Sequence, residues 1–226
     1  IIALASAFKI LKDTYKSLDE KKRLENKFLQ TQLQLKEQEL KFLKMQIHPH
    51  FLFNTLNTLY GFALKKSEKT PEMILKLSSL LDYILYQVDK PLVLLQDEIK
   101  HIEDYVSLEE FRFQESLQIT INKDLIDEKL EIAPMLLLPF VENAFKHGAQ
   151  IDGVVAVNIN LKVDENTLNF TIENSAKNNE NSKKGIGLEN IKKRLEMLHP
   201  KNHFLKILQE EKKFRVNLKI PIKNEE

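Results

Sequence analysis

No glycine or proline interrupts residues 8–47, and this feature constrains the fold of the chain more than any other. The apolar residues in this stretch recur about every 3.5 residues, which is the spacing of a coiled-coil seam with one register slip. They are Phe8, Leu11, Tyr15, Leu18, Leu29, Leu33, Leu40, Leu43 and Ile47. Residues 1–40 are therefore predicted to form a long helical linker that pairs with a second copy as a parallel coiled coil. A solvated helix packed on its own domain is the alternative.

The first eight residues, IIALASAF, are apolar but far fewer than the ~20 that a membrane-spanning helix needs. Two interpretations follow. They are the end of a transmembrane helix, with Lys9 and Lys12 on the cytoplasmic side, or they are the apolar start of a helix.

The composition excludes some classes of site. A formal net charge of +1 argues against a general nucleic-acid surface, which needs a clustered basic excess. The absence of cysteine rules out disulfides and thiolate metal sites. Four of the five glycines lie at or beyond Gly148, so we expect a helical N-terminal half and loops in the C-terminal half.

A helical hairpin is predicted after the linker, within a region that spans residues 41–115. Pro49 should kink the helix, which then continues to about Lys66. Thr70 and Pro71 indicate the start of the next helix, with the threonine as its cap. Paired with a second copy, the hairpin would make a four-helix bundle.

A further helix is predicted from Glu98 to Phe113, before the pattern changes. His101 is expected on its surface or in a capping role. The acidic residues in and before this helix are expected to form a solvated face: Asp97, Glu98, Glu103 and Asp104.

Beyond Glu115 the apolar residues alternate, which is typical of strands. A buried helix is predicted from Pro134 to Lys146, and a hairpin turn at residues 164–167. Strands interleaved with a few helices indicate an α+β layer, placed at residues 116–226.

The segment HPHFLFN, residues 48–54, carries the first candidate for chemistry. A histidine on a helix surface can act as a nucleophile, a base or a metal ligand. A metal site at His48 and His50 is disfavoured, because a proline separates them and no cysteine or acidic cluster lies nearby.

The second candidate is a cluster of polar residues at the end of an apolar helix: Glu142, Asn143, Lys146 and His147. The last three should share one face, with Glu142 at its edge. An amide oxygen suits Mg²⁺, and a lysine and a histidine can neutralise phosphate charge. The alternative is an ordinary helix end, with Gly148 as its C-cap.

Two glycines, Gly185 and Gly187, lead into the last predicted helix, at residues 188–198. A helix N-terminus that the ligand can approach closely is suited to binding an anion. A plain loop-to-helix turn is the alternative for this motif taken alone.

Taken in order, these motifs resemble those of the LytS-like sensor histidine kinases. HPHFLFN is similar to the acceptor motif of that family. LPFVENAFKHG, residues 138–148, matches the N box of the ATP-binding superfamily shared with gyrase and MutL, and GIGLENIKKRL, residues 185–195, matches its second glycine box. The resemblance covers residues 41–220 and implies a Bergerat-type ATP-binding domain, an α/β sandwich.

The resemblance also implies roles for the site residues. His50 is the implied phosphoacceptor, and His48 is the weaker candidate. Asn143 would hold Mg²⁺, while Lys146 and His147 would face the phosphates of ATP. Glu142 stands where ATPases of the superfamily have a base that activates water. Asn54 would orient a water for removal of the phosphoryl group from the partner.

One stretch departs from the family pattern. Where the superfamily reads Asp-x-Gly, this chain has Glu173-Asn174-Ser175. Glu173 is aligned with the aspartate that accepts a hydrogen bond from adenine, and Ser175 with the glycine. The longer side chain and the missing glycine predict weaker nucleotide binding. Gly185 and Gly187 would close over the nucleotide.

The function expected from the resemblance is ATP-dependent phosphorylation of a histidine, followed by transfer to an aspartate of a response regulator, of the LytTR type. The expected partners are a second copy of the chain and the membrane, through a preceding segment on its cytoplasmic face, with no direct nucleic acid. A dimeric signalling scaffold with a degenerate nucleotide pocket is the alternative. An ATPase of the gyrase kind would leave HPHFLFN unexplained.

Overall fold

The computed structural model describes residues 2–44, 49–124, 129–177 and 186–224, and the chain divides into two compact units, Ile1–Gln46 and Ile47–Glu226. The first unit is a single helix, α1 (Ile2–Lys44). Its exposed apolar side chains include Tyr15, Leu18, Phe28 and Leu33, so the coiled coil stays a prediction. Within the described residues, no helix combines the length and the apolarity that crossing a bilayer requires.

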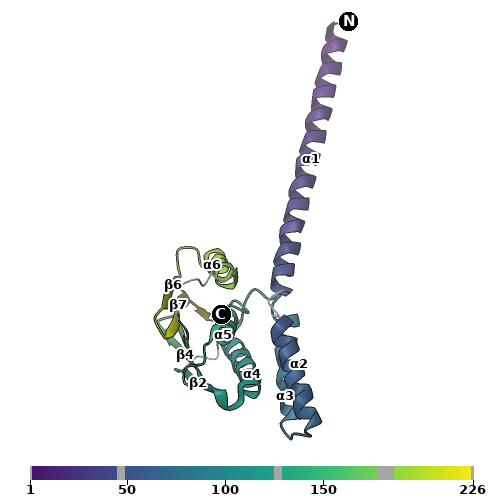
Figure 1. Ribbon diagram of the computed structural model, residues 1–226. Coiled ribbons are helices and arrows are strands. Elements are labelled where there is room, and N and C mark those ends of the chain that lie inside the picture. Colours follow the sequence, from purple (N-terminus) through teal and green to yellow (C-terminus); the bar gives the residue numbers. More distant parts are fainter. Residues whose placement is uncertain (1, 45–48, 125–128, 178–185, 225–226) are drawn as a thin grey trace. The chain divides into compact units, whose positions relative to one another are not determined.

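The second unit begins with two neighbouring helices, α2 (Pro49–Leu64) and α3 (Thr70–Tyr86), as predicted (Figure 1). α2 starts at the proline, and the predicted kink falls on residues 45–48, outside the described residues. The cap predicted at Thr70 is wrong. Lys69 holds the N-cap position, and among the described residues the buried hydroxyl of Thr70 has no hydrogen-bond partner.

After β1 (Val93–Leu94), helix α4 (Leu95–Phe113) packs against both α2 and α3. The solvated face predicted for α4 is only partly present, because Glu98 and Asp104 are buried. His101 is buried too, with its ring 3.3 Å from that of Tyr83, and burial lowers its pKa to about 3. Contacts with α3 therefore cover a face of α4 that the charged residues of α4 had indicated as exposed.

The main sheet has five strands in the order β2-β4-β5-β7-β6, and a 3-10 turn (Gln114–Ser116) leads into it. Its first two strands run parallel and the other neighbours antiparallel. The strands are β2 (Leu117–Lys123), β4 (Val155–Asp164), β5 (Thr167–Ser175), β6 (Phe204–Gln209) and β7 (Lys213–Pro221). The turn predicted between β4 and β5 is confirmed, since Glu165 and Asn166 have φ of 45° and 58°.

Helices cover one face of this sheet, as the packing of Phe140 in α5 (Leu138–His147) on Phe170 of β5 shows. The last helix, α6 (Ile186–Leu198), lies next to α5 (Figure 1). The predicted α+β class is therefore confirmed. The helix predicted from Pro134 begins only at Leu138, because Met135 adopts a left-handed φ of 55°.

A second, three-stranded sheet was not predicted. It joins β1, β3 (Leu130–Ile132) and β8 (Lys223–Asn224), which are too short to show an alternating pattern. Because β1 pairs with β3, this sheet connects residues on both sides of the domain boundary predicted near Glu115. That boundary stays a prediction.

Candidate functional site

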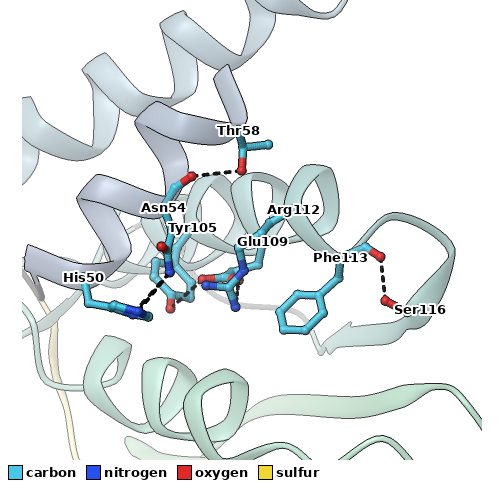
Figure 2. Close-up of polar contacts among 8 residues, drawn as sticks. All are labelled: His50, Asn54, Thr58, Tyr105, Glu109, Arg112, Phe113 and Ser116. Atoms are coloured by element: carbon cyan, nitrogen blue, oxygen red, sulfur yellow. Dashed lines mark hydrogen bonds and ion pairs between the residues drawn. The ribbon is translucent and has the colours of Figure 1, made fainter. Parts of the chain in front are cut away.

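The acceptor candidate His50 lies in the first turn of α2. Proline suits the first position of a helix, where no backbone donor is needed, so Pro49 starts α2 and leaves the next residue on its surface. His50 is exposed, and Asn54 follows one turn later. The Asn54 amide nitrogen lies 3.2 Å from Nδ1 and 3.4 Å from Nε2 of the imidazole (Figure 2). The structure therefore brings these two predicted residues together.

Aromatic packing positions this turn of α2. Phe51 is 8% exposed and stacks on Tyr105 of α4, with ring centroids 4.5 Å apart. Tyr105 in turn meets Phe145 of α5 edge-on, at 5.8 Å. This chain of rings links the histidine-bearing helix to the helix that carries the N box.

Helix α5 divides its four polar residues between two stripes. Glu142 and Lys146 line a cavity, whereas Asn143 and His147 are not among the residues that line it. A step of one residue rotates a side chain by about 100°, so the two pairs lie on neighbouring stripes. Asn143, Lys146 and His147 are still spaced three and four residues apart on α5, so their grouping on one face stays a prediction.

Gly148 ends α5, but not as the left-handed cap that the sequence suggested. Its φ is −58°, in the range open to any residue. A Cβ at this position would lie 2.8 Å from the carbonyl oxygen of Ala144 and 2.8 Å from Cγ1 of Val155. Close packing therefore requires the glycine here.

The cavity is open, has a volume of about 950 Å³ and is of a size that accepts a small ligand. Three helices contribute its walls. The polar side chains in it are His50, Asn54, Asn57, Thr58, Tyr105, Glu109, Arg112, Ser116, Glu142 and Lys146. A histidine, two carboxylates and two cationic side chains thus line one space.

Sequence reasoning missed Glu109 and Arg112, which lie near the end of α4 (Figure 2). Glu109 Oε2 lies 2.6 Å from the Arg112 guanidinium, and Oε1 accepts a hydrogen bond of 3.2 Å from the Tyr105 hydroxyl. Burial raises the pKa of Glu109 to about 7, although Arg112 opposes the shift. A basic residue in the last turn of a helix is a common pattern, so nothing local marked this pair as part of a site.

Half-buried Asn143 and exposed His147 remain available for a ligand on their own stripe. Although its side chain is largely exposed, the loss of some surrounding water, and then the charge of Lys146, lowers the pKa of His147 and favours a neutral ring. No group of three or more histidine, aspartate or glutamate side chains in the described ranges could hold a metal ion. Mg²⁺ held through phosphate oxygens needs only one or two protein ligands, so a single amide suffices.

The structure does not place Glu173 with the other predicted site residues. It lies on the open face of the sheet, where Lys213 donates a hydrogen bond of 2.7 Å and Arg215 adds an ion pair. The hydrogen bond from Lys213 and the contacts with Arg215 lower its pKa. Helix α5 packs on the opposite face, so the structure does not bring Glu173 beside the N-box helix, and its contact with adenine stays a prediction.

The neighbouring residue, Asn174, faces the helices instead. Successive side chains on a strand point to opposite faces, so Asn174 shares the buried face of Phe170 and Ile172. Ser175 is also buried, and its hydroxyl donates to the Ala149 carbonyl at 2.6 Å. The end of β5 thus presents an amide, not a carboxylate, on the side of α5.

The second glycine box can be described only in part. Gly187 lies in the first turn of α6, whereas Gly185, like His48, lies outside the described residues. Further along α6, Arg194 donates hydrogen bonds of 2.6 and 2.8 Å to the carbonyls of Pro134 and Met135. These bonds tie α6 to the segment that leads into the N-box helix.

Comparison with known proteins agrees with these motifs. The histidine kinase family model matches residues 38–117. The chain is 30% identical over 208 residues to the sensor protein LytS of Oceanobacillus iheyensis, covering 84% of this chain and 35% of that protein. It is 31% identical over 206 residues to the sensor histidine kinase YesM of Bacillus subtilis, covering 87% and 36%.

The chain therefore spans about a third of the length of these curated relatives. Among solved structures, the histidine kinase domain of Erythrobacter litoralis EL346 aligns with 76% of this chain and 95% of its own, with 14% identity and a TM-score of 0.47. The motifs and the sequence relatives lead to one conclusion: this chain belongs to the LytS-like sensor histidine kinases.

Proposed function

We propose that the chain is the kinase portion of a two-component sensor, which transfers the γ-phosphoryl group of ATP to His50 and then passes it to an aspartate of a response regulator. The observation that carries this proposal is the shared cavity. His50 of α2 and Lys146 of α5, the N-box helix, line the same space. An acceptor and a phosphate-neutralising cation thus meet where transfer would occur.

Each side chain has a part in this reaction. The His50 imidazole attacks in its neutral form, and Asn54, within 3.2 Å of the ring, restrains its orientation. Lys146 neutralises phosphate oxygens, and Glu142 is placed to accept a proton in the same cavity. The Asn54 amide would also orient a water if the same site removes phosphate from the regulator.

The nucleotide is proposed to lie along the other stripe of α5. Asn143 offers a half-buried amide oxygen that fits Mg²⁺, and the neutral ring of His147 can donate to a phosphate. Mg²⁺, when bound, would neutralise the charge on the phosphates. Asn174 takes the place proposed for Glu173 and would meet the base, with Gly185 and Gly187 near the phosphates.

The wider assembly is also a proposal. A second copy would cover the exposed apolar side chains of α2 and α3, and the preceding segment would place the kinase at the cytoplasmic face of the membrane. A regulator of the LytTR type is the proposed recipient of the phosphoryl group.

One observation favours a second candidate function, a dimeric scaffold that binds nucleotide without transfer. The carboxylate expected at the end of β5 is turned to the other face, and an amide stands in its place. Because an amide nitrogen cannot accept the hydrogen bond that a carboxylate would, binding through Asn174 depends on its single oxygen.

Incubation with Mg·ATP, followed by mass spectrometry at neutral or basic pH, tests the proposal. We expect one phosphoryl group on the wild-type protein and on His48→Gln, and none on His50→Gln. Label lost only from His48→Gln would contradict the assignment of the acceptor. Bound nucleotide without label would favour the scaffold, and steady phosphate release without a phosphoprotein would favour an ATPase.

A further inference from the structure

Arg112 lies in the cavity of the acceptor histidine, although neither the motifs nor the predicted site includes it. It projects from the last turn of α4 into the space that His50 and Lys146 also line. Helix α4 lies against both α2 and α5, so its end reaches the point where the acceptor helix and the N-box helix meet. Figure 2 shows the guanidinium beside Glu109, near the turn that carries His50 and Asn54.

The contacts of Arg112 position its guanidinium without using up its donors. Within the described residues, Arg112 forms an ion pair of 2.6 Å with Glu109. Its guanidinium carbon also lies 4.4 Å from the ring centroid of Phe113. Glu109 Oε2 is buried and has no hydrogen-bond partner in the described parts of the chain, so this contact lacks hydrogen-bond geometry. A guanidinium carries five N–H donors, which leaves several for a ligand.

The carboxylates in the cavity explain why a second cation, Arg112, would favour phosphate binding there. Arg112 and Lys146 line the cavity together with the carboxylates of Glu109 and Glu142. Two carboxylates would repel an incoming triphosphate, and one flexible ammonium offsets only part of that charge. A planar guanidinium binds two phosphate oxygens at once, which suits the equatorial oxygens of a phosphoryl group in transfer.

A purely structural ion pair is the competing explanation. Glu109 and Arg112 are three residues apart on one helix, and an arginine in the last turn is favoured by the helix dipole. That explanation predicts a loss of stability when Arg112 is replaced, and no specific effect on a reaction that ATP has already saturated. The two explanations therefore differ in a measurable way.

We propose that Arg112 is a catalytic residue that contacts the γ-phosphoryl group as it moves to His50. This inference rests on the proposed function. In the step, a ring nitrogen of His50 bonds to the γ-phosphorus while the bond from phosphorus to the bridging oxygen breaks. ADP leaves with that electron pair, and the proton on the other ring nitrogen passes to Glu142 and from there to solvent. Glu109 holds the guanidinium in place before ATP arrives.

The test compares the full chain with Arg112→Gln, Arg112→Lys and Lys100→Gln. Lys100 is exposed on α4, so its replacement removes the same charge from the same helix. The measurements are the rate of phosphorylation at saturating Mg·ATP, the affinity for Mg·ADP and the thermal unfolding of each variant. ADP lacks the group that Arg112 is proposed to contact, so its binding separates transfer from general nucleotide affinity.

We expect Arg112→Gln to slow phosphorylation about 100-fold, the usual effect of removing one donor to a transition state. Arg112→Lys, which keeps the charge without the planar fork, should lose about tenfold. Lys100→Gln should stay within about twofold, and Mg·ADP affinity should stay within about threefold of wild type in all variants, because no γ-phosphate is involved.

A wild-type rate in Arg112→Gln would overturn the inference, and so would an equal loss of rate and Mg·ADP affinity. If Arg112→Gln does not fold, Arg112→Lys decides the matter by the same two measurements. A wild-type protein that takes up no label at all would refute the proposed function and this inference with it.

Discussion

Glu109 shows how far burial has changed the chemistry of one side chain. It is 1% exposed and shares its two oxygens between the Arg112 ion pair and the Tyr105 hydroxyl. Even so, burial raises its pKa from 4.5 to about 7. The attraction of one nearby cation does not fully offset the free-energy cost of removing a carboxylate from water.

This shift predicts a pH dependence of stability. Between pH 4.5 and about 7 the folded protein keeps the Glu109 proton that the unfolded chain has released, so stability falls as the pH rises through this range. The cost is absent below this range and fully present above it, and it is on the order of 3 kcal/mol. We expect Glu109→Gln to gain stability over wild type as the pH rises from 4.5 to 8, as measured by urea unfolding.

The exposed neighbour Glu110 supplies the control. Glu110→Gln should follow the wild-type curve across the same pH range, because an exposed carboxylate keeps its contact with water in the folded protein. Parallel curves for Glu109→Gln and wild type would show that the ion pair with Arg112 fully offsets the burial of Glu109.

At the scale of elements, Glu98 joins three parts of the second unit. Its carboxylate accepts a hydrogen bond of 2.5 Å from the Tyr83 hydroxyl of α3, and bonds of 2.9 and 3.1 Å from the backbone of Met135 and Leu137. The last two groups lie just before α5. A single side chain of α4 therefore ties the helical hairpin to the start of the N-box helix.

We expect the loss of this link to be costly. Glu98→Gln should lower the free energy of unfolding by about 2–3 kcal/mol, because an amide leaves a buried N–H or hydroxyl donor unpaired. Tyr83→Phe should cost about 1–2 kcal/mol, and the double variant less than the sum of both. Urea unfolding measures all three.

Glu103→Gln is the matched control for these variants. Glu103 lies on the same helix, and its ion pair with Lys123 is half exposed. Its replacement should change stability by less than about 1 kcal/mol. Additive effects of the Tyr83 and Glu98 variants would mean that their hydrogen bond contributes nothing beyond the separate contacts.

At the scale of the whole molecule, the hairpin carries a stripe of exposed apolar side chains. Phe53, Leu56, Tyr60 and Leu64 follow one another along α2 at helical spacing, and Phe53 is 67% exposed. Exposed stripes of this kind mark contact surfaces in soluble proteins. The proposed homodimer would bury this stripe in a four-helix bundle.

Sedimentation equilibrium tests this dimer. We expect wild type to be dimeric, and Leu56→Lys/Tyr60→Lys to raise the dissociation constant at least about tenfold, since two buried apolar contacts are lost. Met197 of α6 is 74% exposed but lies outside the hairpin, so Met197→Lys should behave as wild type. An equal effect of both changes would refute an interface at this stripe.

The sequence alone was enough to predict the α+β class, the extents of most helices, the presence of strands beyond Glu115 and the turn between β4 and β5. These features depend on the period of apolar residues and on turn chemistry, which act over a few neighbours. The same holds for the motifs, because HPHFLFN and LPFVENAFKHG are contiguous. Family membership followed from them and is confirmed.

Tertiary structure decided the details that depend on distant parts of the chain. The register of β5 in the sheet places Glu173 on the open face and Asn174 on the face covered by helices. Contact with α3 buried Glu98 and His101, which their charge had indicated as exposed. Arg112 joined the cavity of His50 only because α4 ends between α2 and α5. A side chain's neighbours along the chain set its local conformation, but its exposure and partners come from elements far away in sequence, and no local pattern records them.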